Sequence, residues 1–139
     1  MIPPAADRFL REHTRTFLVT VRPDGAPTCH PMVAFYRNGA LYLNTYRKSA
    51  KVRNIAHDAR VACVVVTDDG DARFRGVVVK GRAEVLPPGT PFPQTESSSD
   101  RPEGVGTDVV RLVQARLASG KRVLVRVVPD DVRLVGEDA

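Results

Sequence analysis

The strongest pattern in the sequence is a series of short runs of apolar and β-branched residues, separated by turn residues. Asn38-Gly39, which lies between two of these runs, is the dipeptide most typical of a tight β-hairpin. Six or so short strands at hairpin spacing, with a few helices, favour a small antiparallel barrel of the α+β, mainly β, class. The runs predict strands at residues 16–21, 28–36, 40–45, 60–67 and about 72–86, with one or two more between 121 and 135.

Proline and glycine mark the places where these strands are expected to depart from regular pairing. Pro31 has no N–H to donate to a neighbouring strand, so we expect a free edge or a bulge at that point of the second strand. Gly76 and Gly81 lie inside the fifth strand and indicate a bulge or a bend, as a closing barrel needs.

A short helix interrupts the strand pattern after residue 49. Val52, Ile55, Ala56 and Ala59 recur at the spacing of one apolar helix face, and the Ser49 hydroxyl is suited to cap the first turn. A second helix is predicted at 107–119, and a weaker one at 3–14. Between them, residues 87–106 are rich in proline, glycine and serine and predict a surface loop.

Length and composition limit the possible classes of protein. A chain of 139 residues can bury one core, so we expect residues 1–139 to form a single domain. The net charge of +5 permits anionic ligands without implying nucleic acid. The N-terminal residues do not look like a secretory signal, and no apolar run approaches the length of a membrane span. We therefore expect a cytoplasmic protein with no membrane partner.

The histidines and cysteines do not form a recognisable metal or redox site. His13, His30 and His57 lack metal-type spacing, and Cys29 and Cys63 form no CxxC pair. We expect both cysteines to be small buried residues and no metal to be bound. The acidic run at 68–71 is better explained by an exposed hairpin turn.

Four cations, Arg47, Lys48, Lys51 and Arg53, lie within seven residues at the start of the helix that follows residue 49. A helix N-terminus presents unpaired N–H groups and the positive end of the helix dipole, so it favours an anion. Ser49 and Lys51 could hold one phosphate there, with Arg47 and Lys48 folding over it. The residues alone leave two alternatives open: an ordinary solvated helix face, and a strip for nucleic acid that would have few aromatic residues for base stacking.

The order of these elements resembles the pyridoxamine-5'-phosphate-oxidase-like split-barrel superfamily of flavin and deazaflavin proteins. The segment "SAKVRNIAHDARV", residues 49–61, is similar to the phosphate-binding helix of the coenzyme F-420-dependent branch. The resemblance covers most of the chain and depends on motifs in a fixed order rather than on one signature. These motifs are "PDGAP", "CHPMVAFY", "NGALYLNT", "RKSAKVRNI" and "DARVACVVV", followed more loosely by "GVVVKGRAEVL" and "RVLVRVVPDDVRLV".

The resemblance implies a six-stranded antiparallel split β-barrel, usually a homodimer with two cofactor sites at the subunit interface. It implies that the phosphate lies at Ser49 and Lys51, that Asn54 supports the site from inside the helix, and that Thr45 reaches the ribityl chain or the phosphate. Backbone groups of residues 29–33 would lie against the ring system. The implied cofactor-binding residues are Arg47, Lys48, Ser49, Lys51, Asn54, Thr45, Pro31, Met32 and Val33.

The implied function is that of a redox enzyme. It would bind coenzyme F-420, which we favour, or FMN, and transfer hydride to or from a small organic substrate; the alternative is a non-catalytic carrier or sensor of such a cofactor. Because the cofactor ring carries the hydride chemistry, no catalytic side chain is assigned. Pyridoxamine-phosphate oxidases end in a segment that bears tryptophan and arginine, whereas this chain has no tryptophan and ends in "RLVGEDA". We therefore expect no pyridoxal-phosphate synthesis.

Overall fold

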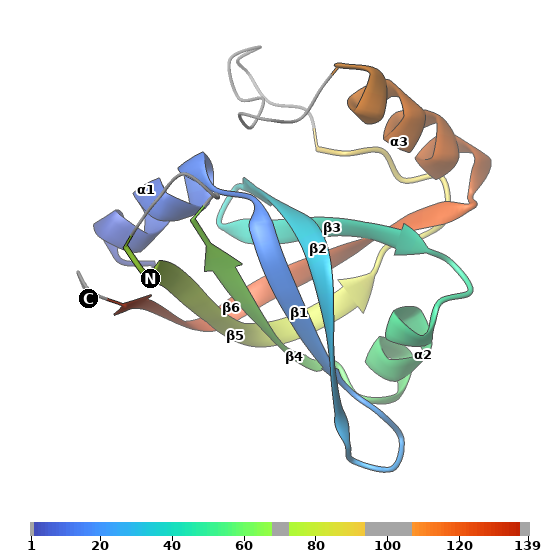
Figure 1. Ribbon diagram of the computed structural model, residues 1–139. Helices are drawn as coiled ribbons and strands as arrows, with labels where there is room; N and C mark the ends of the chain where they lie inside the picture. Colours follow the sequence, from blue (N-terminus) through green and yellow to red (C-terminus); the bar gives the residue numbers. More distant parts are fainter. Residues whose placement is uncertain (1, 68–72, 94–106, 137–139) are drawn as a thin grey trace.

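The computed structural model describes residues 2–67, 73–93 and 107–136. Its six strands pair in the order β1-β2-β3-β6-β5-β4, and β4 pairs again with β1, so the antiparallel sheet closes into a barrel (Figure 1). The predicted six-stranded antiparallel barrel is therefore confirmed. The strands are β1 (Arg15–Val21), β2 (Pro27–Arg37), β3 (Ala40–Tyr46), β4 (Arg60–Val66), β5 (Arg75–Val85) and β6 (Arg122–Gly136), and the helices of the described residues are α1 (Pro4–Glu12), α2 (Ala50–His57) and α3 (Thr107–Ser119).

The observed elements lie close to the ranges predicted from sequence. The final segment, predicted as one or two strands, is the single strand β6. Asn38 and Gly39 have φ angles of 51° and 77°, the left-handed conformation of a tight hairpin turn, and they join β2 to β3 as predicted. The predicted turn at 68–71 and residues 94–106 of the predicted loop lie outside the described residues.

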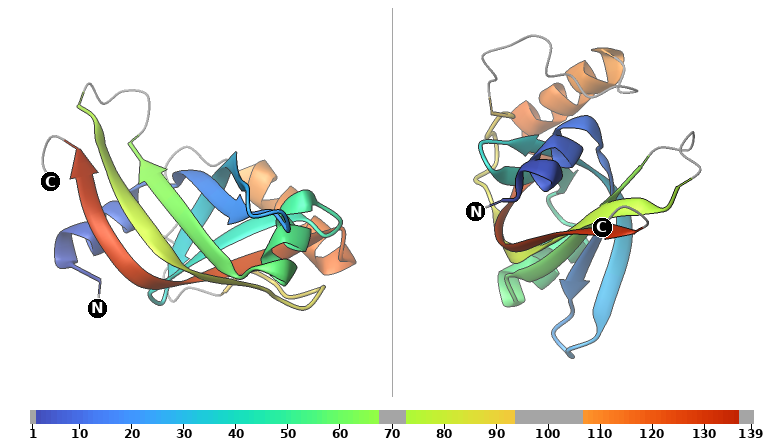
Figure 2. Two further views of the ribbon diagram at one scale, coloured as in Figure 1. Left: turned by 90° about the horizontal axis from the view of Figure 1, so that it is seen from below. Right: turned by 90° about the vertical axis from the view of Figure 1, so that its left-hand side faces the viewer.

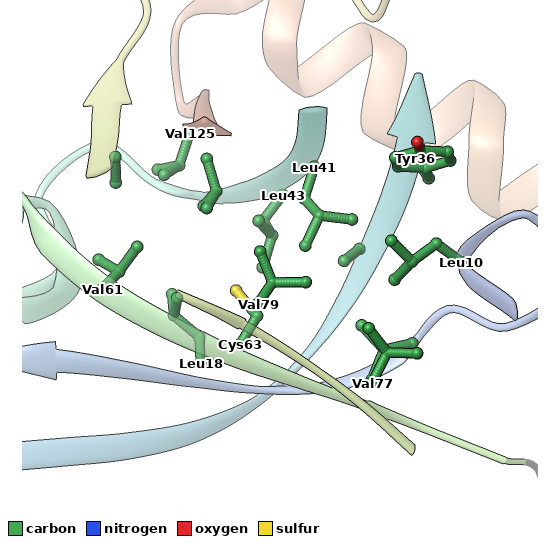
Figure 3. Packing of buried hydrophobic residues seen from close by; sticks show 14 of the residues in the cluster. Leu10, Leu18, Tyr36, Leu41, Leu43, Val61, Cys63, Val77, Val79 and Val125 are labelled. Atoms are coloured by element: carbon green, nitrogen blue, oxygen red, sulfur yellow. The ribbon is translucent and has the colours of Figure 1, made fainter. Parts of the chain in front are cut away.

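The barrel interior is filled by alternate side chains of the strands. In β1, Thr16, Leu18 and Thr20 are buried, whereas Phe17 between them is 41% exposed. This alternation is the period of two that a strand imposes on its side chains. Figure 3 shows part of the resulting core, to which every strand contributes: leucine and valine side chains predominate, Cys63 lies among them, and β2 supplies Tyr36. Cys63 is fully buried, as predicted, and this burial raises the pKa of its thiol to about 12.

The structure places the predicted irregularities at Pro31 and at Gly81. Residues 27–33 of β2 pair with β1 alone, and pairing with β3 begins at Ala34, so Pro31 lies on a strand segment with one free edge. The register of β5 and β6 shifts between Lys80 and Gly81, which confirms a bulge there. A Cβ at Gly81 would overlap the carbonyl oxygen of Val128. The register runs unbroken through Gly76, so no bulge forms at that described position.

Helix α3 packs on the outside of the barrel, above β3 and β6 (Figure 1). Leu117 of α3 is 1% exposed and belongs to a second, smaller core with Tyr42 of β3 and Leu124 of β6. Because β3 is covered on both faces, its side chains are buried almost without alternation. This packing accounts for the burial of Tyr42. Among the described residues, no helix has the length and apolar character needed to cross a membrane.

Helix α1 closes one end of the barrel, opposite to α2 (Figure 2). Its residues Phe9 and Leu10 enter the main core. A polar contact fixes the same helix to β2: the Tyr36 hydroxyl donates a hydrogen bond of 2.7 Å to Asp7, and Arg11 pairs with that carboxylate. Burial, followed by the hydrogen bond to Asp7, raises the pKa of Tyr36 to about 12.

We expect Tyr36→Phe to reduce the loss of stability at alkaline pH. A tyrosine with a pKa of 10.0 in the unfolded chain and about 12 in the native state contributes stability that is complete below pH 10 and is lost as the pH rises through 12. Urea denaturation across this range is expected to show a shallower decline in the free energy of unfolding for the variant. Tyr46→Phe is the control, because the pKa of that exposed tyrosine is lowered. Equal declines for wild type and Tyr36→Phe would contradict the prediction.

Candidate anion site at the start of helix α2

The first turn of α2 has the geometry of a capped helix N-terminus. Ser49 is the N-cap residue, with extended backbone angles, and its Oγ accepts a hydrogen bond of 3.3 Å from the N–H of Val52. Its own N–H donates to the carbonyl of Tyr46 at 3.0 Å. Of the N–H groups that a helix start leaves without an intrahelical partner, those of Ala50 and Lys51 have no acceptor among the described residues. The helix therefore presents two backbone donors beside a serine hydroxyl.

The end of β3 places Thr45 next to this cap. The Thr45 and Ser49 hydroxyl oxygens lie 3.3 Å apart, and Thr45 is only 3% exposed. A buried hydroxyl at the end of a barrel strand has little freedom to move, so Thr45 helps to fix the position of Ser49. The structure thus brings together two of the residues that the sequence pointed to.

The cations around the cap differ in their exposure and in their contacts. Arg47 and Lys48 are exposed in the turn before the helix, whereas Lys51 is partly buried in its first turn. None of these three side chains pairs with a carboxylate in the described part of the chain. Arg53, by contrast, donates to the backbone carbonyl of Lys48 at 2.8 Å, so it braces the turn. No carboxylate of residues 2–67, 73–93 or 107–136 therefore balances the positive charge of these three side chains.

Asn54 fixes the opposite face of α2 to the barrel. It is 5% exposed, and its amide donates to the Thr20 hydroxyl at 3.0 Å and to the Thr28 hydroxyl at 3.5 Å. These two hydroxyls are in turn 2.8 Å apart. Replacing one group of this network would remove a hydrogen bond from each of its partners, which is costly in a buried site. Thr20 and Thr28 were not identified from sequence; their inward position on either side of the β1–β2 turn was the signal that could have found them.

The β2 residues predicted to lie against a cofactor ring do not share one face of the strand. Met32 points inward against the core, whereas Pro31 and Val33 are exposed. They follow Thr28, where β2 meets α2, by three to five residues, about 10–17 Å along a strand. Only an extended ligand could contact both these three residues and the part of β2 that meets α2. Cys29, expected to be buried, is exposed, because it is paired in register with Val19 on the outer face of the barrel.

His30 and His13 each have a buried Nδ1 without a hydrogen-bond partner in the described structure. His30 is the register partner of Leu18, whose side chain enters the core, so the histidine lies on the inner face of β2. No contact of the described residues links it to the start of α2. It is therefore not included in the anion site.

A closed six-stranded antiparallel barrel with a serine-capped helix after its third strand defines a protein of the split-barrel class. The model of the family described as pyridoxamine 5'-phosphate oxidase matches residues 2–136. This chain belongs to that family. No curated protein matches the chain.

Solved structures extend this likeness. An F-420 reductase is 25% identical to this chain with a TM-score of 0.65, over 95% of this chain and 98% of that one. A conserved hypothetical protein from Mycobacterium tuberculosis is 24% identical with a TM-score of 0.70, over 98% and 85% of the two chains. A FAD-binding protein from Mesorhizobium loti is 18% identical with a TM-score of 0.65, over 98% and 96%. The last two likenesses concern the fold alone.

Proposed function

We propose that this protein is a redox enzyme of the cytoplasm that binds a phosphorylated flavin-type cofactor and transfers hydride to or from a small organic substrate. The observation that carries the proposal is the start of α2, where the N–H groups of Ala50 and Lys51, which find no acceptor in the described structure, lie beside the Ser49 hydroxyl. A phosphate placed there accepts hydrogen bonds from these groups and meets the positive end of the helix dipole. The ammonium group of Lys51 adds a charge from the same turn.

Further residues complete the phosphate site in this proposal. Arg47 and Lys48, which carry no described ion pair, supply additional charge from the turn before the helix. Thr45 reaches the phosphate or the ribityl chain, because its hydroxyl lies beside that of Ser49. Asn54 does not touch the cofactor in this arrangement. It positions the helix through Thr20 and Thr28 and so keeps the donors of the first turn aimed at one point.

The ring system of the cofactor is proposed to lie along residues 29–33 of β2. This segment pairs with β1 alone, so its other edge offers backbone N–H and C=O groups that no strand uses. Pro31 interrupts the donors of this edge. Met32 and Val33 give the ring apolar contacts on the two faces of the strand. When bound, the cofactor supplies the hydride chemistry, and the chain's residues bind and orient it.

Coenzyme F-420 is the cofactor we favour over FMN. The similarity to an F-420 reductase supports this choice. So does the number of cations near Ser49 that make no ion pair with a described residue, since F-420 carries an anionic oligoglutamate tail in addition to its phosphate. Membership of the pyridoxamine 5'-phosphate oxidase family does not carry that oxidase activity to this chain, which has no tryptophan.

We also propose that the protein is a homodimer with cofactor sites at the subunit interface. The outer face of β1 and β2 presents apolar side chains to solvent: Phe17 is 41% and Val33 43% exposed, and Pro31 is the register partner of Phe17. Contiguous apolar surface of this kind is typical of protein interfaces. A second subunit on this face would also cover part of the β2 segment assigned to the ring.

A titration of the purified protein with F-420 and with FMN, side by side, tests the proposed function. We expect micromolar or tighter binding of at least one cofactor, followed by its turnover with a reductant or an organic acceptor. Tight binding without turnover of any kind would favour a carrier or sensor over an enzyme. Failure to bind either cofactor, together with nucleic-acid binding that weakens steeply with salt, would contradict the proposal.

A further inference from the structure

A second group of cations lies where β3 ends and β6 begins. Tyr46 and Arg122 are register partners across these two strands, and the Arg122 guanidinium lies 4.1 Å from the centre of the Tyr46 ring. Arg122 also donates a hydrogen bond of 2.7 Å to the amide oxygen of Asn44. The ring and the amide hold the guanidinium in place, and neither neutralises its charge.

Further cations lie beside this pair: Arg47 follows Tyr46 and Lys121 precedes Arg122 in the chain, and α3 contributes Arg116. Arg116 is in the last turn of α3, which packs against β6, the strand that carries Arg122. Hydrogen bonding and charge from Arg122, followed by the charge of Arg116, lower the pKa of Tyr46. The Arg47 N–H donates to the Lys121 carbonyl at 3.1 Å, which joins the turn after β3 to the turn before β6. Within the described ranges, none of these arginines and lysines pairs with a carboxylate.

This group adjoins the start of α2. The Tyr46 carbonyl accepts the hydrogen bond from the N–H of Ser49. Residues 46–49 therefore form a closed turn, whose ends lie within about 7 Å of each other. An anion at Arg122 and a phosphate at Ser49 would be neighbours on one surface, at a spacing that a single ligand can span.

Tyr46 and Arg122 are better prepared for binding than the solvated face of a helix. Exposed cations on one helix keep their rotamer freedom, which an anion must remove on binding. Here Arg122 is already ordered by two partners, the Asn44 amide and the face of the 54% exposed Tyr46 ring. A planar guanidinium held in this way can bind a carboxylate or phosphate through two parallel hydrogen bonds.

We infer that Tyr46, Arg122, Arg116 and Arg47 form a second anion subsite, which binds a carboxylate or a further phosphate of the same cofactor, beyond the phosphate at Ser49. The inference rests on the proposed function and extends it. Two sources of the anion share this chemistry: the glutamate tail of F-420, and the second phosphate of a flavin dinucleotide.

Matched ligand pairs test the subsite. Arg116→Gln and Arg122→Gln are titrated with F-420 and with the same deazaflavin phosphate lacking its glutamate tail, and with FAD and FMN. We expect each variant to bind the ligand that carries the extra anion about tenfold more weakly, with the affinity for its shorter partner unchanged. If affinity for the longer ligand falls within the deazaflavin pair, the glutamate tail supplies the anion. If it falls within the flavin pair, the second phosphate supplies it.

Controls separate the possible failures. Arg8 is an exposed residue of α1, at the opposite end of the barrel from α2 (Figure 2). Arg8→Gln is expected to leave the affinities for all four ligands unchanged. The Arg116 side chain has no hydrogen-bond partner among the described residues, so its variant is expected to keep the wild-type melting temperature even if loss of the Asn44 contact destabilises Arg122→Gln. Equal affinities in variant and wild type, or equal weakening within a pair, would overturn the subsite. A wild-type protein that binds none of the four ligands would overturn the proposed function itself.

Discussion

Replacing Lys51 with alanine is expected to raise the dissociation constant of the phosphorylated cofactor about tenfold to a hundredfold, with little change in the stability of the protein. The magnitude corresponds to the loss of one charge-assisted hydrogen bond to a phosphate. Lys51 makes no ion pair in the described structure, so the fold loses little when its charge is removed. Affinity is measured by titration of fluorescence or absorbance, and stability by urea denaturation of the same samples.

Two companion variants make this test specific. Ser49→Ala is expected to weaken binding as well, but also to reduce stability by about 1 kcal/mol, because Ser49 caps the N–H of Val52. Lys80→Ala removes the same charge from an exposed position on β5 and is expected to leave affinity unchanged. Wild-type affinity in both Lys51→Ala and Ser49→Ala would disprove the phosphate assignment.

Gly81→Ala is expected to lower the free energy of unfolding by about 3 kcal/mol, at the upper end of the usual cost of overpacking. The added Cβ would overlap the Val128 carbonyl oxygen and lie 3.0 Å from the Cα of Pro129. These are backbone atoms, so the clash cannot be relieved by turning a side chain. β6 would have to move away from β5 at the bulge, which would disturb the closure of the barrel.

Urea denaturation measures this effect, with Lys80→Ala as the control. Lys80 precedes the glycine on the same strand, and its side chain is exposed, so truncation is expected to change stability by less than about 0.5 kcal/mol. A Gly81→Ala variant as stable as Lys80→Ala would show that the bulge tolerates a side chain and that the close approach of β6 is not required.

The barrel could be predicted from sequence because its determinants are local. The Asn38-Gly39 turn, the alternating runs and the Ser49 cap each act within a few residues, and all are found in the structure. The prediction that Cys29 is buried was wrong for an equally clear reason. An apolar or small residue in a strand can face either side, and only the register of the pairing decides which.

The candidate site was likewise predictable from sequence only in part. Ser49, Lys51 and the cations beside them are neighbours in sequence, so a helix start that favours an anion was visible without a structure. The polar network behind the helix was only partly visible, because Thr20 and Thr28 meet Asn54 across 34 and 26 positions of the chain. The pairing of Arg122 with Asn44, 78 residues away, has no local signal at all.

The sequence by itself determined the strands, the turns and the helix whose first turn points to a phosphate, since these follow from propensity and from the spacing of apolar residues. Closure of the sheet through β1 and β4, the free edge of β2 and the meeting of Tyr46 with Arg122 were decided by the tertiary structure. Each of these depends on which strands pair and in what register. That choice is made by the packing of the whole core, in which every strand contributes side chains to one interior.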